Sequence, residues 1–592
     1  MDAIDIGPDP APERWTARPL LLAGLGLATG IVVHLILGET NLDTAAFTAL
    51  QGALVIGITL GAVLIGFTIE GRLWWTSLAF GVAMGIAAGL VTWWNGSPAS
   101  WSQGEVWRTM SLFLAVAIAA PLFQAARDEG TRRPSYPAVH DHLWANVVLW
   151  CASWAFVGLV FLMTLLLAGL FQLIKIDLLH DLLMKNWFCR VLVGLAFGSA
   201  LGVLREHDAV VRTLQRVITT LLAVLAPVLA IGLALFLLAL PFTGLQALWS
   251  ATSQTTPLLL ACAAGALILC NDVIGAHEAD ERRNPLLRYG AMVLAAVILP
   301  LGALAAVATS LRIGQYGYTP ERLWAVVFVA IACLWGAAYL VALVRGRMQW
   351  TRRVRPTNLV LAALVCVLGL VLATPLVSFN AISTRDQVGR LESGKTSPEK
   401  FDWRALAFDF GQPGRDALAR LKRSANAVIR TKAAEAAKAE YRYDGSFDPL
   451  PVFAGKYDVH PAGGALPEDL KTLIVRERAC EGENICRVHL IDAQTAVVID
   501  DRCGALAPNA PANAYCSTDT RTYVRNDKGW IDVNSLLQRG AGKARPAAIT
   551  REERQASRKR ENDAVAKGEV TVRKVEMRQV YVGDEPEGEP FK

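Results

Sequence analysis

The sequence predicts a mainly α-helical membrane protein, in which a bundle of about eleven transmembrane helices is followed by a soluble α+β C-terminal domain with a small disulfide-stapled β unit. Eleven apolar runs between residues 19 and 376 have about the 18 residues needed to cross a bilayer as a helix. Only helices and closed barrels satisfy every backbone polar group there. A polar tail of about two hundred residues follows the runs, and four cysteines cluster within it.

The composition changes near Pro375 and predicts five parts. They are a cytoplasmic N-terminal arm (1–18), a transmembrane domain (19–376), juxtamembrane helices (377–440), a periplasmic cysteine-containing β-rich unit (441–538), and a basic, partly disordered tail with a late strand (539–592). The first apolar run is too long for the core of a signal peptide, so we expect it to remain as a span. The net charge of +6 is modest and spread out, which favours positive loops at a membrane surface over a nucleic-acid partner.

The expected spans take up most of the first 376 residues. The fourth is short and the fifth is long, and an odd count places the two chain ends on opposite sides of the membrane. In order, the spans are Pro19–Leu37, Ala45–Ile69, Leu73–Trp94, Trp107–Phe123, Ala145–Leu170, Trp187–Leu204, Val217–Leu240, Pro257–Ile274, Leu286–Leu311, Glu321–Val344 and Thr357–Leu376.

The charge of the loops predicts the orientation of these spans. Lysine and arginine near span ends concentrate on the cytoplasmic side. The opposite loops carry only Lys175, Lys185 and Arg312. We therefore expect a cytoplasmic N-terminus and a C-terminal domain on the outer side of the membrane. The positive side carries Arg14, Arg18, Arg72, Arg127, Arg132, Arg133, Arg205, Arg212, Arg216, Arg282, Arg283, Arg345, Arg347, Arg352, Arg353 and Arg355.

Cysteine usage agrees with that orientation. Six cysteines lie in or beside spans, where a free thiol behaves as a small apolar group. Cys480, Cys486, Cys503 and Cys516 lie in the tail, and an even set in an extracytoplasmic segment predicts two disulfides, with three pairings open. A four-thiolate zinc site is the weaker alternative because its closely paired cysteines are missing. No metal or cofactor is expected.

Within the spans, glycines and prolines mark close packing. Gly81, Gly85 and Gly89 repeat every four residues, as do Gly194, Gly198 and Gly202, and Gly57 and Gly61 add a shorter instance. This spacing lets helix backbones approach closely, and we favour packing within one subunit over a dimer contact. Pro227 and Pro300 predict kinks in the seventh and ninth spans, which are more often structural than part of a transport site.

Few ionisable groups lie deep in the predicted spans, which argues against an ion-coupled pump with a carboxylate relay. Asp272 is the strongest single candidate for a buried polar function, and an interfacial residue paired with a loop arginine is the simpler alternative. The full set of candidate polar residues is Asn271, Asp272, Glu206, His207, Arg312 and Tyr316.

The tail predicts helices followed by strands. Ser397 with Pro398 is typical of a helix start, and residues 414–440 have the composition of another helix. Residues 540–567 are basic and low in apolar content, which is typical of a solvated helix or a disordered segment. Strands are expected at Thr472–Val475, Arg487–Ile491, Thr495–Ile499, Thr522–Val524 and Val570–Val582.

Two stretches are similar to a known family. The loop around Arg312, with Gln315-Tyr316-Gly317 and Thr319-Pro320-Glu321-Arg322, and the segment from Ser383 to Asp416 resemble the bacterial domain of unknown function 4153. Within the second stretch, the resemblance rests on residues 390–395, 397–402 and 411–416. It covers the spans and the juxtamembrane helices through about residue 430. It implies a multi-pass bacterial membrane protein and transfers no catalytic residue.

Three functional hypotheses follow. The leading one is a non-enzymatic envelope scaffold or sensor, whose periplasmic domain contacts envelope proteins and whose membrane domain contacts lipids. The first alternative is a transporter or permease for a small molecule or lipid. The second is a membrane enzyme acting on lipid or glycan at a loop mouth, with Glu206, His207, Asp272 or Arg312. The oligomeric state stays open.

Overall fold

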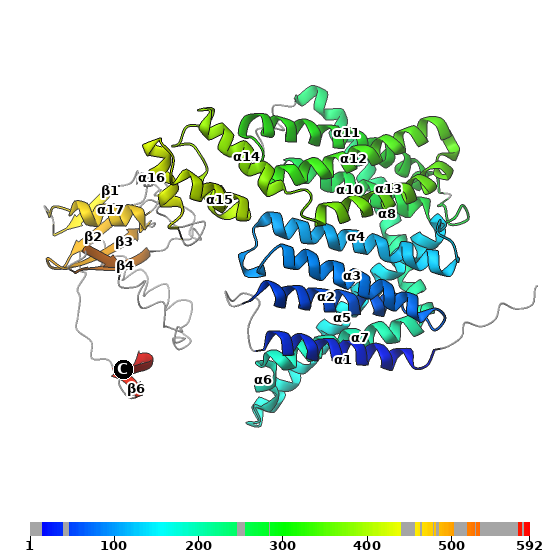
Figure 1. Ribbon diagram of the computed structural model, residues 1–592, viewed down its shortest axis with the longest axis horizontal. Helices are drawn as coiled ribbons and strands as arrows, with labels where there is room; N and C mark the ends of the chain where they lie inside the picture. Colours follow the sequence, from blue (N-terminus) through cyan, green and yellow to red (C-terminus); the bar gives the residue numbers. More distant parts are fainter. Residues whose placement is uncertain are drawn as a thin grey trace, which may run out of the picture. The chain divides into compact units, whose positions relative to one another are not determined.

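The computed structural model describes residues 15–38, 47–244, 255–282, 284–439, 456–461, 464–477, 479–480, 485–501, 518–526, 529–532, 578–582 and 585–591. The chain divides into two compact units, Met1–Ala437 and Lys438–Lys592 (Figure 1). The first is a helical bundle and the second holds a small sheet.

Eleven described helices are long and apolar enough to cross a membrane, which confirms the predicted fold class. They run through the first unit in the order of the predicted spans. The fourth is longer than expected, because Ser102 and Glu105 form a capping box that starts it at Gln103. The helices are α1 Arg18–Leu37, α2 Ala49–Thr68, α3 Trp74–Trp94, α4 Gln103–Asp128, α5 Tyr136–Leu173, α7 Asn186–Glu206, α8 Asp208–Thr243, α10 Thr255–Ile274, α11 Pro285–Tyr316, α12 Pro320–Gly346 and α13 Thr351–Ala373.

The shorter helical segments of the first unit lie between or after these helices. They are η1 Pro98–Ser100, α6 Leu178–Leu183, η2 Arg347–Gln349, α14 Phe379–Glu392, the π-helical turn η3 Ala405–Asp409, α15 Gly411–Leu421 and α16 Ala427–Ala436.

The two ends of α4 identify the two ends of the bundle. Near its C-terminus, Arg127 donates hydrogen bonds to the Thr68 carbonyl and to the Ser77 hydroxyl. We call this the arginine end, and α1 begins there. Near the N-terminus of α4, Glu105 accepts a 2.7 Å hydrogen bond from Asn380 of α14. We call this the junction end. The chain therefore enters and leaves the bundle at opposite ends, as an odd number of crossings requires (Figure 1).

Glycines hold two pairs of helices at close distance. A Cβ atom on Gly26 of α1 would lie 2.0 Å from the carbonyl oxygen of Gly194 on α7. A Cβ on Gly57 of α2 would lie 2.8 Å from the carbonyl oxygen of Gly85 on α3. No side chain fits at such contacts, so the predicted packing of glycine faces within one chain is confirmed.

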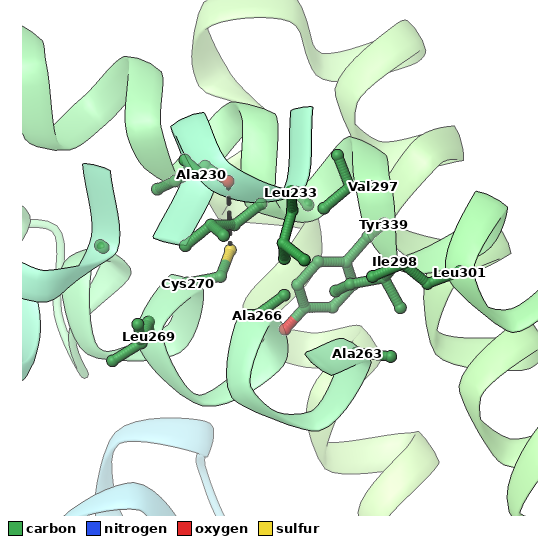
Figure 2. Close-up of a cluster of buried hydrophobic side chains, with 14 of the residues drawn as sticks. Ala230, Leu233, Ala263, Ala266, Leu269, Cys270, Val297, Ile298, Leu301 and Tyr339 are labelled. Atoms are coloured by element: carbon green, nitrogen blue, oxygen red, sulfur yellow. Dashed lines mark hydrogen bonds between the residues drawn. The ribbon is translucent and has the colours of Figure 1, made fainter. Parts of the chain in front are cut away.

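The largest core lies between α8, α10, α11 and α12. Tyr339 and the apolar side chains around it are buried there, and the Cys270 thiol donates to the Ala291 carbonyl (Figure 2). Pro227 and Pro300 lie inside α8 and α11, and both helices continue through them. A Cβ on Gly290 would lie 3.1 Å from Cα of Pro227, so α11 packs closely on α8 at that proline.

The segment after α13 differs in detail from the expectation. Ser397 and Pro398 begin a turn rather than a helix. The helical turn starts later, where the Asp402 carboxylate accepts from the Ala405 N–H at 2.9 Å. The helix expected over residues 414–440 is two helices, α15 and α16, because Asn426 caps a new helix start by accepting from the N–H groups of Val428 and Ile429.

The second unit contains a five-stranded sheet with the order β1-β2-β3-β4-β5. β1 pairs in parallel with β2, and the other neighbours are antiparallel. A separate hairpin joins β6 and β7. The elements are β1 Lys456–His460, α17 Glu468–Arg476, β2 Ile485–Leu490, β3 Thr495–Asp501, β4 Thr518–Asn526, β5 Gly529–Asp532, β6 Arg578–Val582 and β7 Glu585–Phe591.

Three of the predicted strands are confirmed as β2, β3 and β4, with shifted ends. The strand predicted at Thr472–Val475 is wrong, because those residues belong to α17. That helix buries Leu470, Leu473 and Ile474 against the sheet residues Val488 and Tyr523. The late strand is present as β6 from Arg578, and residues 570–577 lie outside the described part. The segment 540–567 also lies outside it.

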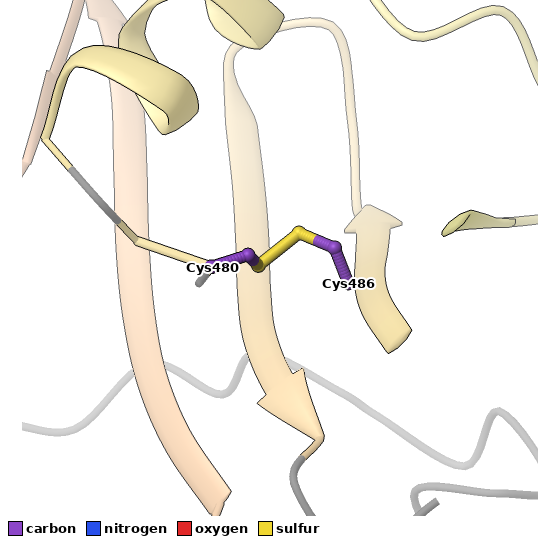
Figure 3. The surroundings of a disulfide bond; sticks show 2 residues. All are labelled: Cys480 and Cys486. Carbon is purple, nitrogen blue, oxygen red and sulfur yellow. A yellow bond between two sulfur atoms is a disulfide. The ribbon is translucent and has the colours of Figure 1, made fainter. Parts of the chain in front are cut away.

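A disulfide joins Cys480 to Cys486 at the edge of this core (Figure 3). Cys486 is fully buried at the start of β2. The pairing confirms the disulfide-stapled β unit and contradicts a zinc site that would need all four thiolates. Cys503 and Cys516 lie outside the described residues, so the second predicted bridge stays a prediction.

Reduction of this disulfide is expected to loosen β2 in the full-length protein. The bridge spans a sequence separation of 6. In the chain-entropy model, a loop that short contributes about 2 kcal/mol. Hydrogen exchange should show faster exchange of the β2 and α17 amides with a reductant present. In the double variant Cys480→Ser/Cys486→Ser, the same amides should exchange fast both with and without the reductant. Equal exchange in the oxidised and reduced wild type would contradict a stabilising role.

Candidate functional site

The juxtamembrane helix α14 binds the loop between α11 and α12. The Asp386 carboxylate accepts from the Tyr318 N–H at 2.8 Å. The Gln387 amide donates to the carbonyls of Tyr316 and Tyr318 at 2.8 and 3.0 Å. The Arg390 guanidinium donates to the Gln315 carbonyl at 3.0 Å. These side chains follow one face of α14, so the helix provides hydrogen-bond partners for the backbone of this loop.

Gly317 makes this contact geometrically specific. Its φ is 77°, in the region that favours glycine. A Cβ there would lie 2.4 Å from Asp386 Oδ2 and 2.7 Å from Gln387 Nε2. On the other side of the loop, Arg322 of α12 donates to the Gly317 carbonyl at 2.7 Å, and its guanidinium lies over the Tyr316 ring. The loop is therefore clamped between α14 and α12.

A second contact joins α14 to the start of α4. Asn380 is buried, and its amide donates to Glu105 Oε1 and also contacts the Ser102 hydroxyl. A Cβ on Gly411, at the start of α15, would lie 2.7 Å from the same carboxylate oxygen. We call the two contacts together the junction. It ties the segment that follows the last span to the fourth, ninth and tenth spans.

An apolar cleft of about 520 Å³ lies beside the junction, lined by α4, α10, α11 and α12. We call its junction end the mouth, where the lining residues Gln103, Thr256 and Glu321 are the first or second residues of their helices. Trp107 and Trp324 stack at 6.0 Å between ring centroids below the mouth. Phe379 of α14 packs edge-on against Trp324 at 5.0 Å. The volume is within the range of about 300–1,000 Å³ that is typical of ligand sites.

A buried amide cluster lies beyond the deep end of the cleft. Trp335, which lines the cleft, donates through its indole N–H to Asn358 Oδ1 at 3.2 Å. The Asn358 amide donates to Asn271 Oδ1 at 2.6 Å. The Tyr339 hydroxyl lies 2.9 Å from both amide oxygens, and its single hydrogen serves one of them at a time. The cluster fixes α10, α12 and α13 together.

The structure does not bring the six sequence-predicted polar residues into one site. Asn271 belongs to the amide cluster. Arg312 and Tyr316 lie at the junction end, in and beside the clamped loop. Glu206 and His207 end α7 at the arginine end, where His207 Nδ1 contacts the Val203 carbonyl.

Asp272 is the buried member of that set. It lies in α10 one residue after Asn271, and within the described residues neither carboxylate oxygen has a hydrogen-bond partner. Arg282 acts on it electrostatically, but the Arg282 guanidinium donates to the Thr220 hydroxyl and lies outside ion-pair distance of Asp272. A direct pair between Asp272 and a loop arginine is therefore not formed in the described structure.

The sequence did not reveal the structural role of Arg205 and Arg355, two buried arginines at the arginine end. Arg205 and Arg18 both donate to the Glu70 carboxylate, and Arg205 also donates to the Gly66 carbonyl at 2.7 Å. Arg355 donates to the carbonyls of Ile274 and His277, and so caps α10 with a positive charge where its dipole is negative. The positions of Arg205 and Arg355 at span ends are the sequence signal for such caps, because arginine near a helix C-terminus can donate to the last carbonyls.

In the second unit, two histidines stack across β1 and β2. His460 and His489 are register partners, with ring centroids 4.6 Å apart and planes at 8°. His460 Nε2 lies 3.3 Å from Asp458 Oδ1, and Arg487 also pairs with Asp458. Burial and the adjacent His460 lower the pKa of His489 below its ordinary value, and the Asp458 charge opposes that shift. The folded protein therefore favours the neutral form of His489.

Acidification is expected to weaken the second unit. The unfolded chain takes up a proton on His489 near pH 6.5, whereas the folded protein takes it up only at lower pH. Between the two values the unfolded state binds more protons, so stability is full above about pH 6.5 and falls as the pH falls. Pulse proteolysis in urea should show this loss between about pH 7.5 and 5.5. His489→Gln should reduce it and the exposed-site control His207→Gln should not. An unchanged loss in His489→Gln would refute the assignment.

The fold and junction define a class: a multi-pass helical membrane protein whose last span is tied back to the bundle by a juxtamembrane helix. A family model described as "Domain of unknown function (DUF4153)" matches residues 46–421, and the chain belongs to that family. The matched range ends at Leu421 of α15, so it contains every residue of the junction. Comparisons with curated proteins and with solved structures found no match.

Proposed function

We propose that this protein is a non-enzymatic scaffold or sensor of the bacterial inner membrane, with a periplasmic domain that contacts envelope proteins. The structure of the junction is the main support for this proposal. The two stretches by which the chain resembles its family, Gln315 to Arg322 and Ser383 to Asp416, meet there through hydrogen bonds between side chains and the backbone of residues 315–318. Their polar groups are engaged in holding α14 in place, which is the arrangement that a mechanical link between a membrane bundle and an external domain needs.

Loop charge supports the orientation. The arginine end carries Arg18, Arg127, Arg205 and Arg355, and most of the other basic loops join the helices at that end. By the positive-inside rule, that end faces the cytoplasm. The junction end and the chain that follows it then face the periplasm, where a disulfide such as Cys480–Cys486 persists.

Photocrosslinking in intact cells tests the scaffold role. A photoreactive amino acid at Thr472, Gln494 or Arg525, exposed in the second unit, is expected to give protein adducts of defined mass. The same group at Leu235, an exposed apolar position in α8, is expected to give none. The junction variant Asp386→Ala/Gln387→Ala should weaken the adducts, and Arg385→Ala, exposed on the same helix, should not. Absence of protein adducts at all three positions would contradict the proposal.

A lipid-handling role is the second candidate, and the apolar cleft favours it over a permease for polar solutes. Glu321 is the single ionisable side chain among the described residues that line that cleft. A membrane enzyme would need carboxylates or a His–Asp pair that converge on one face. Glu206 and His207 lie at the opposite end of the bundle from Arg312, so the residues nominated for that role do not form such a group.

A further inference from the structure

We propose that the cleft between α4, α10 and α12 binds one acyl chain of an amine-bearing phospholipid, with the headgroup at Glu321. This inference rests on the sensor role and deepens it by naming its ligand. The cleft lies on membrane-spanning helices, so a bilayer supplies acyl chains at its side. Its described lining is almost entirely apolar or aromatic, and it approaches the junction through Trp324 and Phe379.

The length of the cleft fits an acyl chain. On α12 it runs from Glu321 to Trp335, and at 1.5 Å per residue this is about 21 Å. One leaflet contributes about half of a hydrocarbon core that is about 30 Å thick. A chain that entered at the junction end would therefore reach past the midplane and end beside Trp335. The small side chains of Ala263, Ala264 and Ala332 leave room for an acyl chain along this path.

The chemistry of the mouth selects the headgroup. Glu321 is the second residue of α12 and is exposed, and Gln103, the first residue of α4, lines the same end of the cleft. Among the described residues no cation lies within ion-pair distance of the Glu321 carboxylate, and Arg322 acts on it electrostatically from farther away. A carboxylate at the mouth favours a headgroup with a primary amine and disfavours a purely anionic one. Trp107 and Trp324 each lie about one helical turn from the start of α4 and of α12, and aromatic side chains are enriched at the ends of membrane spans.

Occupancy of the cleft would affect α14 through the contact between Trp324 and Phe379. Trp324 lines the cleft and packs against Phe379, the first residue of α14. An acyl chain in the cleft would pack against the Trp324 ring and restrict its motion. In an empty cleft the ring lacks that contact. The junction thereby places a lipid-dependent side chain against the helix that leads to the second unit.

Photolabelling of the full-length protein in vesicles tests the proposal. The probe is phosphatidylethanolamine with a diazirine on its acyl chain, and phosphatidylglycerol with the same group is the comparison. Mass spectrometry should find more adducts on the cleft faces of α10 and α12 than on the exposed face of α8 around Leu235. Phosphatidylethanolamine should label the cleft more than phosphatidylglycerol does, and Glu321→Gln should remove that preference.

Two matched pairs of variants separate binding from general lipid contact. Ala264→Phe and Ala332→Phe place a ring inside the cleft, whereas Ala261→Phe and Ala330→Phe place one on nearby exposed positions outside it. The first two should reduce cleft labelling about tenfold, which corresponds to roughly 1.4 kcal/mol, and the second two should not.

Three outcomes decide between the proposals. Labelling equal to that of the α8 face, unchanged by the filling variants, would mean annular lipid only and overturn the cleft as a lipid site. Equal labelling by both headgroups would overturn the choice of headgroup. Protein adducts at Thr472, Gln494 or Arg525 would leave the scaffold role standing in either case.

Discussion

Gly26→Leu is expected to prevent α1 from packing on α7 and to lower the free energy of unfolding of the bundle strongly. A Cβ at this position would lie 2.0 Å from the Gly194 carbonyl oxygen and 2.8 Å from its carbon. These are backbone atoms, so the two helices must separate along the whole contact. Overpacking a tight core costs about 1–3 kcal/mol and occasionally more, and a backbone clash lies at the upper end.

Gly24→Leu is the matched control, because it lies on the same helix and a Cβ there has no atom within 4 Å. Thermal unfolding in detergent, followed by the fraction of protein that stays monodisperse, should show a large drop for Gly26→Leu and little change for Gly24→Leu. Equal midpoints for the two variants would show that the α1–α7 contact is not formed.

Removal of Glu70 is expected to give the second large effect. Its carboxylate pairs with Arg18 and with Arg205, whose side chains are 12% and 7% exposed. Glu70→Ala removes the carboxylate with which both cations form ion pairs. Breaking a fully buried pair costs about 3–5 kcal/mol, and since the Glu70 side chain is 37% exposed, we expect about 2–3 kcal/mol. Glu70→Gln retains an acceptor oxygen and should lose less.

Glu278→Ala gives the comparison at the same end of the bundle. Glu278 pairs with Arg352, and both side chains are more than half exposed. Exposed pairs contribute about 0–1 kcal/mol, so the midpoint should hardly move. If Glu278→Ala and Glu70→Ala lowered the unfolding midpoint equally, Arg18 and Arg205 would not depend on Glu70.

The helices of the membrane unit could be predicted because the hydrocarbon core imposes a length. An apolar run of about 18 residues has few alternatives to a spanning helix, and the eleven predicted runs match the eleven described helices. Glycine spacing likewise predicted close packing. The partners of each glycine could not be predicted, because a periodic face does not say which helix it meets.

The secondary structure of short segments in the tail was harder to predict, because local residue preference and tertiary packing favour different structures there. Thr472-Leu-Ile-Val475 has strand-like side chains, but Pro467 and the acidic pair Glu468-Asp469 precede it. Leu470, Leu473 and Ile474 fall on one helical face and bury against the sheet. Packing against the sheet therefore stabilises a helix rather than a strand over these residues. At Ser397 the helix-start pattern was present, but Asp402 supplies the cap that is used.

The junction lay beyond sequence reasoning for a different reason. Gly317 and Asp386 belong to loops and helices about seventy residues apart, and each has an ordinary local explanation. The polar face of α14 was visible in the sequence, but its partner was a backbone loop with no side-chain signature. The amide cluster of Asn271 and Asn358 is similar, because one amide in each of two spans gains meaning only when the helices meet.

The central claim is that the chain crosses the bilayer an odd number of times, so that the arginine end and the C-terminal unit lie in different compartments. A fluorescent protein that matures only in the cytosol, fused after Lys592, measures this directly, with alkaline phosphatase at the same position as the reciprocal reporter. We predict no fluorescence and active phosphatase. A bright fluorescent fusion with inactive phosphatase would contradict the arrangement.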